Sequence, residues 1–284
     1  MTRDETTLAA IAARAGVTIV APLTGGEFGA TLVRDGSGRE LVLKAMPPER
    51  WERAWARGAA LANHLRSGGY PAPKYIATGA AHGVTWSLQE RLAGEVPEVV
   101  SAVHMRQLLA LADRHADAAP EPRDWLTGLM PWIEDSLQRI LEEPRTRTLA
   151  EELEDVLARR DHVSVREGDV VHGDFHHRNF LAIGDEVTAV FDWEFASPGD
   201  WRYDLVTLAF WSALLRWQIP PAVAAMAVER MRERCPADVI ALFAAMRAAE
   251  QVEFNLRNYP ERLSEFVEGV ERWIAPWWRS RAQT

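Results

Sequence analysis

Residues 170–192 constrain the fold and the chemistry of this chain more than any other stretch. Asp174 and Asn179 are five residues apart, and Asp192 follows thirteen residues later. Each of these oxygen-bearing side chains stands beside a short apolar run. The pattern predicts a short buried strand, a polar loop, a return strand and a second polar turn.

Phosphoryl transfer from a nucleotide needs such a set of side chains. It requires a carboxylate near the attacking hydroxyl, oxygen ligands for magnesium and a cation on the donor phosphates. An Asp followed five residues later by Asn is the spacing of a kinase catalytic loop. We therefore predict that Asp174 is the catalytic base and that Asn179 and Asp192 hold Mg²⁺. The alternative is that Asp174 and Asn179 only cap a turn.

The chain resembles the aminoglycoside phosphotransferase and choline kinase family in two paired motifs. They are His-Gly-Asp-x-His-x-x-Asn at residues 172–179 and Asp-Trp-Glu-x-Ala-x-x-Gly-Asp-x-x-x-Asp-Leu at residues 192–205. The family usually has Pro and Gly where this chain has His177 and Arg178, a departure that concerns the shape of the loop more than its chemistry.

The resemblance implies an α+β, two-lobed, protein-kinase-like fold. Residues 1–93 would form a small nucleotide-binding lobe with an antiparallel sheet, and residues 94–284 a larger, mostly helical lobe for catalysis and substrate binding. The resemblance also implies that His172 and His176 support the catalytic loop. A zinc site is the alternative for the histidines, but no cysteine or Glu-containing metalloprotease motif accompanies them.

Lys44 is the candidate cation for the donor phosphates. It is one of only two lysines. It lies in the apolar run 40–46, where a charged ammonium group needs an anionic partner nearby. That run is the third predicted strand, and kinases place their phosphate-binding lysine on the third strand. The alternative is an edge-strand lysine that discourages aggregation.

A glycine-rich turn joins the first two predicted strands, 19–23 and 30–33. We assign Gly26 and Phe28 in this turn to the nucleotide site, because glycines let backbone N–H groups approach phosphates closely. Many hairpins carry glycines and bind nothing, which is the alternative. The turn lacks the lysine pattern of a P-loop, which excludes that motif.

The helix predicted over residues 49–66 is where kinases carry the Glu that pairs with the lysine. The family tends to place this Glu where the chain has Gly-Ala-Ala at residues 58–60. Glu52, or less favourably Glu49, is therefore the available partner for Lys44.

By resemblance, the end of the strand that starts at residue 84 forms a hinge whose backbone hydrogen-bonds the purine. Its candidate residues are Gln89, Glu90 and Leu92. A simple edge strand is the alternative.

Helical patterns follow at residues 99–118, 125–143 and 146–160 and continue from residue 203. By resemblance, the three carboxylates that follow Asp192 within the second motif have mainly supporting roles, with a metal contact as an alternative for the first: Glu194, Asp200 and Asp204. The family places acidic acceptor-binding residues on its last helices, for which the chain offers Glu250, Glu253 and Glu265. The tryptophans of this region could hold a cationic substrate, although core packing is the commoner role.

Composition limits the partners. The net charge of −9 disfavours nucleic acid and favours a cationic ligand. The single Cys235 excludes an internal disulfide, no signal peptide is evident, and no apolar run reaches membrane-spanning length. We expect a cytoplasmic enzyme; nothing in the sequence indicates its oligomeric state.

These features predict a kinase that uses ATP or GTP and Mg²⁺. No activation-loop motif follows Asp192, so a small molecule is a better acceptor than a protein. A cationic antibiotic, either an aminoglycoside or a basic peptide of the tuberactinomycin type, fits the acidic balance, and its phosphorylation would confer resistance. Choline, ethanolamine or another amino alcohol is the alternative acceptor. A catalytically silent kinase-like binding module is the alternative from another class.

Overall fold

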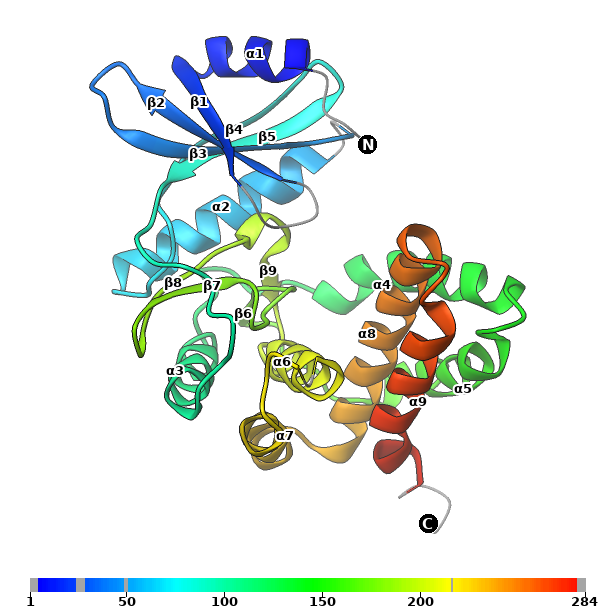
Figure 1. Ribbon diagram of the computed structural model, residues 1–284. Helices are drawn as coiled ribbons and strands as arrows, with labels where there is room; N and C mark the ends of the chain where they lie inside the picture. The colour runs from blue at the N-terminus through cyan, green and yellow to red at the C-terminus, as the bar shows by residue number, and fades with distance from the viewer. Residues whose placement is uncertain (1–4, 24–28, 49–50, 216, 280–284) are drawn as a thin grey trace. The chain divides into compact units, whose positions relative to one another are not determined.

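The computed structural model describes residues 5–23, 29–48, 51–215 and 217–279 (Figure 1). The chain divides into two compact units. The first comprises Met1–Pro97, His172–Asp174 and Arg178–Ser197, and the second comprises Glu98–Val171, Phe175–His177 and Pro198–Thr284. The first break lies close to the expected boundary after residue 93. The hairpin after the catalytic loop belongs to the same compact unit as the N-terminal residues.

A five-stranded antiparallel sheet forms the base of the first unit, with strand order β1-β2-β3-β5-β4. The strands are short runs rich in β-branched and apolar residues, as the sequence predicts. Their bounds are β1 (Val17–Leu23), β2 (Ala30–Asp35), β3 (Glu40–Met46), β4 (Tyr75–Ala81) and β5 (Val84–Glu90).

The two faces of this sheet have different partners, because side chains alternate along each strand. Leu41 and Leu43 of β3 share a buried core with Ile11 of α1 (Glu5–Arg14). Lys44 therefore lies on the other face, as does Ser87, its direct neighbour on β5. α2 (Glu52–Ser67) packs against β4 and β5, and Figure 1 shows α1 and α2 on opposite sides of the sheet.

The strand, loop and hairpin predicted around the first motif are confirmed. β6 (Asp169–Val171) leads into the polar loop 172–179, and β7 (Phe180–Ile183) and β8 (Glu186–Val190) form the antiparallel hairpin. A single 3-10 turn, η3 (Trp193–Phe195), follows Asp192 and packs against α2. β9 (Ser197–Gly199) then pairs with β6.

The second unit is mostly helical, which together with the sheet confirms the predicted α+β fold class. Its longest helix, α8, is buried at every residue from 239 to 249 and packs against α4, α5, α6 and α9. A helix that is mostly apolar around its whole circumference needs such surroundings. The helix bounds are α3 (Ala102–Asp113), α4 (Trp125–Glu142), α5 (Arg147–Leu157), η2 (Arg160–His162), α6 (Arg202–Leu214), α7 (Pro221–Arg234), α8 (Ala237–Asn258) and α9 (Leu263–Arg279).

The predicted helix 99–118 is shorter in the structure. α3 begins at Ala102 because Ser101 caps it, its Oγ accepting a hydrogen bond from the His104 N–H at 3.1 Å. The helix ends at Asp113. Within the described part of the chain, every helix is too short or too polar to span a bilayer.

Candidate active site

Lys44 forms two ion pairs within the first unit. Its Nζ donates to Asp192 Oδ1 at 2.7 Å and to Glu194 Oε2 at 3.3 Å. Both carboxylates come from the segment that follows β8, about 150 residues along the chain from β3. The predicted strand lysine and the second predicted metal ligand are therefore brought together by the fold.

Glu194 is the more buried of the two carboxylates, with 2% of its side chain exposed against 40% for Asp192. Its Oε1 accepts a hydrogen bond from Ser87 Oγ at 3.1 Å, and Ser87 stands directly opposite Lys44 in the β3–β5 ladder. Tyr75 holds the same turn, because its hydroxyl accepts a hydrogen bond from the Trp193 N–H at 3.3 Å.

The charges of this cluster depend on one another. Burial raises the pKa of Glu194 to about 7, with Lys44 opposing the rise and Asp192 adding to it. Burial also acts against the charge of Asp192, but Lys44 and a hydrogen bond with Glu194 outweigh it and lower the pKa of Asp192. The pKa of Lys44 is raised, because its two carboxylate partners outweigh its burial. Asp192 and Lys44 are therefore charged at neutral pH, whereas Glu194 titrates near neutral pH.

The backbone at Asp192 is left-handed, with φ +75° and ψ +46°. This region is uncommon for residues other than Gly, Asn and Asp, and a non-Gly residue there costs about 1–3 kcal/mol. The turn allows the chain to leave β8 and enter η3 with the Asp192 carboxylate directed at Lys44. Backbone strain of this kind is common at functional sites.

The catalytic loop is tied to the segment before Asp192 by His172 and Phe191. The His172 Nδ1 accepts a hydrogen bond from the Asp174 N–H at 3.2 Å, and its Nε2 donates to the Phe191 carbonyl at 2.9 Å. The Phe191 N–H in turn donates to the Asn179 carbonyl at 2.9 Å. His172 is fully buried, and its two hydrogen bonds link the catalytic loop to the residue just before the second motif.

Asp174 and Asn179 lie at the two ends of this loop and contact each other. The Asn179 Nδ2 donates to the Asp174 backbone carbonyl at 2.9 Å and to its Oδ2 at 3.0 Å. The carboxylate of Asp174 is close enough to raise the pKa of Asp192 by repulsion. Three predicted site residues are therefore gathered in the first unit, with Lys44 as the counter-charge.

These residues fit a magnesium ion. Two carboxylates that repel each other, Asp174 and Asp192, gain from a cation near them. Mg²⁺ prefers oxygen ligands and takes one or two carboxylates together with substrate phosphates, so Asp192 and the amide oxygen of Asn179 suffice as protein ligands. Zinc does not fit: among the described residues, no group of three or more His, Cys, Asp and Glu side chains is placed to hold a metal.

The structure separates the candidate hinge residues. Gln89 and Glu90 are both paired in β5, and the Glu90 N–H already donates to the Lys74 carbonyl at 2.9 Å. Leu92 lies beyond the strand, and in the described ranges its backbone makes no hydrogen bond. Leu92 is therefore the hinge candidate whose backbone is available to a purine edge.

The structure does not bring Glu52 to Lys44. Glu52 is an exposed residue in the first turn of α2, and the ion pairs of Lys44 go to the two carboxylates after β8. The reason is the close packing of α2 on η3, which leaves the lysine facing that turn. Glu49 and the glycine-rich-turn candidates Gly26 and Phe28 lie outside the described residues.

The remaining predicted supports belong to the second unit. The His176 ring lies 5.7 Å from the Trp211 ring, and His177 Nε2 lies 2.8 Å from Gln218 Oε1. Asp200 braces the start of α6, since its carboxylate accepts from the Arg202 backbone and guanidinium.

Asp204 is fully buried within α6. Its Oδ2 lies 2.9 Å from His115 Nδ1, and the His115 side chain is also fully buried. This contact fits the structural role that the resemblance implies for Asp204.

Two of the acidic acceptor candidates carry arginine partners. Glu253 is buried and pairs with Arg139 and Arg257 at 3.0 and 3.1 Å. Glu250 pairs with Arg247 at 3.0 Å. Glu265, in contrast, is exposed in the first turn of α9.

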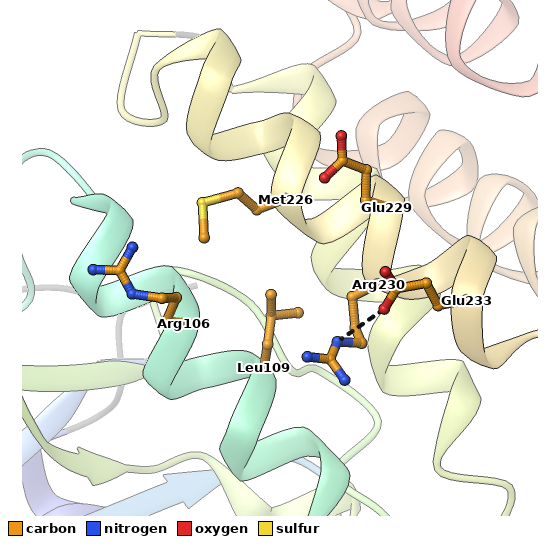
Figure 2. Close-up of a pocket in the computed structure, with 6 residues that line it drawn as sticks. All are labelled: Arg106, Leu109, Met226, Glu229, Arg230 and Glu233. Atoms are coloured by element: carbon orange, nitrogen blue, oxygen red, sulfur yellow. Dashed lines mark ion pairs between the residues drawn. The ribbon is translucent and has the colours of Figure 1, made fainter.

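A pocket of about 370 Å³ lies between α3 and α7, and Figure 2 shows the side chains that line it. Its charged groups pair with each other and with a neighbour: Arg230 lies 3.6 Å from Glu233 and 3.2 Å from Asp113. None of the predicted site residues lines it, and it has no part in the chemistry described above. The lining residues are Arg106, Leu109, Met226, Glu229, Arg230 and Glu233.

Sequence reasoning missed Ser87 and the pairing of Glu194 with Lys44. Ser87 is a polar residue between Trp86 and Leu88 in an apolar strand, which is a signal for a buried hydrogen bond. Gly58 lies where the family tends to place the Glu that pairs with the lysine. A glycine inside a helix indicates that another backbone segment packs closely against it.

The chain matches the model of the phosphotransferase enzyme family over residues 18–237. Among curated proteins it is similar to a homoserine kinase of Janthinobacterium sp. (strain Marseille), with 28% identity over 171 residues. That match covers 53% of this chain and 51% of the relative, so the chain spans about half the length of the curated relative it matches.

Solved structures with the same fold cover nearly the whole chain. A thermostable mutant of aminoglycoside phosphotransferase APH(4)-Ia, in a ternary complex with ADP and hygromycin B, aligns over 99% of this chain and 100% of its own, with a TM-score of 0.71 and 18% identity. Amicoumacin kinase hAmiN, in complex with AMP-PNP, Ca²⁺ and Ami, aligns over 95% and 94%, with a TM-score of 0.66 and 16% identity.

Macrolide 2'-phosphotransferase MphH from Brachybacterium faecium aligns over 93% of this chain and 97% of its own, with a TM-score of 0.54 and 21% identity. The kinase-like fold predicted from the paired motifs is thus confirmed. Since the family model spans most of the sequence, the chain belongs to the phosphotransferase enzyme family.

Proposed function

We propose that this enzyme transfers the terminal phosphate of ATP to a hydroxyl group of a small cationic molecule. One observation carries the proposal: a strand lysine, a loop Asp and Asn, and the Asp after the hairpin lie in one compact unit, where hydrogen bonds join the lysine to the last Asp and the Asn to the loop Asp. Family membership supplies the reaction class.

Asp174 is the group that acts on the acceptor in this proposal. It orients the hydroxyl and accepts its proton as the phosphoryl group moves. His172 holds the Asp174 backbone through the 3.2 Å hydrogen bond to its N–H, which keeps the carboxylate at the right place in the loop.

The donor phosphates are steadied by Lys44. Asn179 and Asp192 would hold Mg²⁺, which when bound neutralises charge on the phosphates. The close ion pair between Lys44 and Asp192 supports this assignment, because both groups face the same point.

ATP is the better supported donor. The solved relatives contain ADP or AMP-PNP, which are adenine nucleotides. GTP, the other donor that the sequence allows, has no such support. Leu92 is the hinge residue whose backbone is available for an adenine edge.

A cationic antibiotic is the proposed acceptor. The net charge of −9 favours a positively charged ligand. The relatives of the same fold are described with aminoglycoside, macrolide and amicoumacin substrates, which supports a small antibiotic. The product would be a phosphorylated, less active drug, so the enzyme would confer resistance.

A small amino-alcohol metabolite such as choline, ethanolamine or homoserine is the second candidate acceptor, favoured by the similarity to a homoserine kinase. The arginine partners of Glu250 and Glu253 also favour it over a large polycation, because these two carboxylates are already neutralised. A silent binding module is less well supported, since Lys44 has carboxylate partners even without a Glu on α2.

A screen with a matched control tests the proposal. Mg²⁺-ATP is incubated with a panel of aminoglycosides, tuberactinomycins and amino alcohols, and products are analysed by mass spectrometry for one added phosphate. The variant Asp174→Asn tests the base, and Asp161→Asn, an exposed carboxylate in the second unit, is the control. Phosphorylation of an amino alcohol but of no antibiotic would move the acceptor to the second candidate. ATP binding without turnover on any acceptor would favour the silent module.

A further inference from the structure

The partner of the nucleotide-binding lysine comes from an unexpected element in this chain. Kinases draw it from the helix that follows the third strand. Here Lys44 faces Glu194, which lies in the 3-10 turn η3 at the start of the second motif.

The helix is unable to provide a carboxylate at this place. A Cβ on Gly58 of α2 would lie 2.0 Å from the Trp193 carbonyl oxygen and 3.1 Å from the Glu194 carbonyl oxygen. Real Cβ atoms essentially never approach backbone so closely, so α2 and η3 are in backbone contact at Gly58. Any longer side chain at residue 58 would displace η3.

Glu194 is fixed by groups from two strands. One of its oxygens accepts from Lys44 of β3 at 3.3 Å, and the other accepts from Ser87 of β5 at 3.1 Å. Since Lys44 and Ser87 are direct cross-strand neighbours, the carboxylate spans the ladder and has little freedom to turn. Its side chain is 2% exposed, which makes it a poor ligand for a solvated ion but a firm anchor for a lysine.

The two carboxylates on Lys44 differ in their surroundings. Asp192 is 40% exposed, as a metal ligand should be, whereas Glu194 is inside. Asp192 would share its carboxylate with a bound Mg²⁺ and would then hold Lys44 less tightly, whereas the buried Glu194 would remain paired with the lysine.

We infer that Glu194 is a positioning residue that replaces the helix carboxylate, holding the Lys44 ammonium in place for the donor phosphates. This inference rests on the proposed function of Lys44. The Gly58 contact and the Glu194 ion pair are then two parts of one arrangement. Because residue 58 of α2 has no side chain, η3 can pack closely against the helix, and η3 carries the Glu194 carboxylate to Lys44.

Binding of Mg²⁺-ATP by isothermal titration calorimetry at about pH 8.5, where Glu194 with its pKa of about 7 is ionised, tests the inference without requiring the acceptor. Glu194→Gln keeps the size and the hydrogen-bond acceptor for Ser87 but removes the charge. We expect it to weaken Mg²⁺-ATP binding roughly tenfold or more, as the loss of a charge-assisted contact implies. The control Glu186→Gln, an exposed carboxylate at the start of β8, and Glu52→Gln on α2 should each change affinity by less than about twofold.

A double-mutant cycle separates positioning from a general structural role. If Glu194 acts through Lys44, then Glu194→Gln in the Lys44→Ala background should add less than about twofold to the loss. An equal, independent loss in that background would overturn the inference. So would a Mg²⁺ requirement that rises in Glu194→Gln whether or not Lys44 is present, because that result would make Glu194 a metal ligand.

Failure of the inference and failure of the proposed function are distinguishable. If the wild-type chain binds Mg²⁺-ATP and Glu194→Gln binds it equally well, the inference is wrong and the proposed function stands. A loss of affinity in Glu52→Gln instead would return the lysine partner to α2. If the folded wild-type chain binds no nucleotide, both fail. Thermal melting of each variant establishes that it is folded at the temperature of the titration.

Discussion

Gly58 of α2 and Trp193 of η3 are in direct backbone contact: a Cβ at residue 58 would stand 2.0 Å from the Trp193 carbonyl oxygen. This contact puts the turn that carries Glu194 against the helix, and it puts Glu194 next to Lys44. Both consequences can be tested by mutation.

Replacing Gly58 by alanine should destabilise the protein by about 2 kcal/mol or more, because the new methyl group overlaps backbone atoms rather than a flexible side chain. Urea unfolding followed by circular dichroism measures the loss. Gly36→Ala is the matched control: a Cβ there meets nothing within 4 Å, so its effect should be within about 0.5 kcal/mol. Equal stability of the two variants would show that α2 and η3 are not in contact.

His172→Gln should lower kcat roughly 10- to 100-fold while changing nucleotide affinity little, since His172 fixes the Asp174 backbone and the Phe191 carbonyl rather than the phosphates. Steady-state kinetics on the acceptor found by the screen, with a binding titration beside it, separates the two quantities. His64→Gln, at an exposed position on α2, serves as the control. A large loss of nucleotide affinity with kcat intact would contradict the role of His172 as a support of the loop.

In the chain without metal or nucleotide, the contribution of Glu194 to the free energy of unfolding should fall as the pH rises toward about 7. Burial raises the pKa of Glu194 from 4.5 to about 7, against which Lys44 acts and to which Asp192 adds. The folded chain therefore holds this proton more tightly than the unfolded chain. The contribution is complete below about pH 4.5 and is lost as the pH rises through about 7.

Asp192 acts in the opposite sense, because its pKa is lowered in the folded chain: its contribution is present above 3.8 and is lost as the pH falls. Lys44, Ser87, Tyr75 and Asp174 are the other groups that act on these two carboxylates. Glu194→Gln cannot titrate, so the slope of unfolding free energy between about pH 5 and about pH 8 should become more positive than in the wild type. An unchanged slope would mean that Glu194 has its ordinary pKa.

Cys235 should be unreactive in the folded protein. It is buried, and burial raises the pKa of its thiol to about 12, with Arg202 acting in the opposite direction. A chromogenic disulfide reagent at about pH 8 should therefore label it at least about a hundredfold more slowly in buffer than in denaturant. Comparable rates under the two conditions would place Cys235 at the surface.

Much of the site could be predicted because its signals are local. The apolar runs around Asp174, Asn179 and Asp192 predict the strand, loop and hairpin that the structure has, and the apolar run around Lys44 predicts β3. Each of these depends on residues within a few positions.

The lysine partner could not be predicted in the same way. Glu194 meets Lys44 across 150 residues of sequence, and it does so because α2 and η3 touch at a glycine. A helix position without a carboxylate can be read from the sequence, but the element that fills the gap depends on packing between distant segments. The hinge is a similar case, because the pairing of Glu90 with Lys74 depends on the register of two strands.

The central claim is that this chain transfers phosphate from ATP with Asp174 as the base. Radiolabelled phosphate transfer from ATP to the acceptor identified by the screen, compared between the wild type and Asp174→Asn, tests it most directly. We predict transfer by the wild type, a loss of roughly 10²- to 10⁴-fold in Asp174→Asn with nucleotide binding retained, and full transfer in Asp161→Asn. Wild-type transfer that persists in Asp174→Asn would contradict the account.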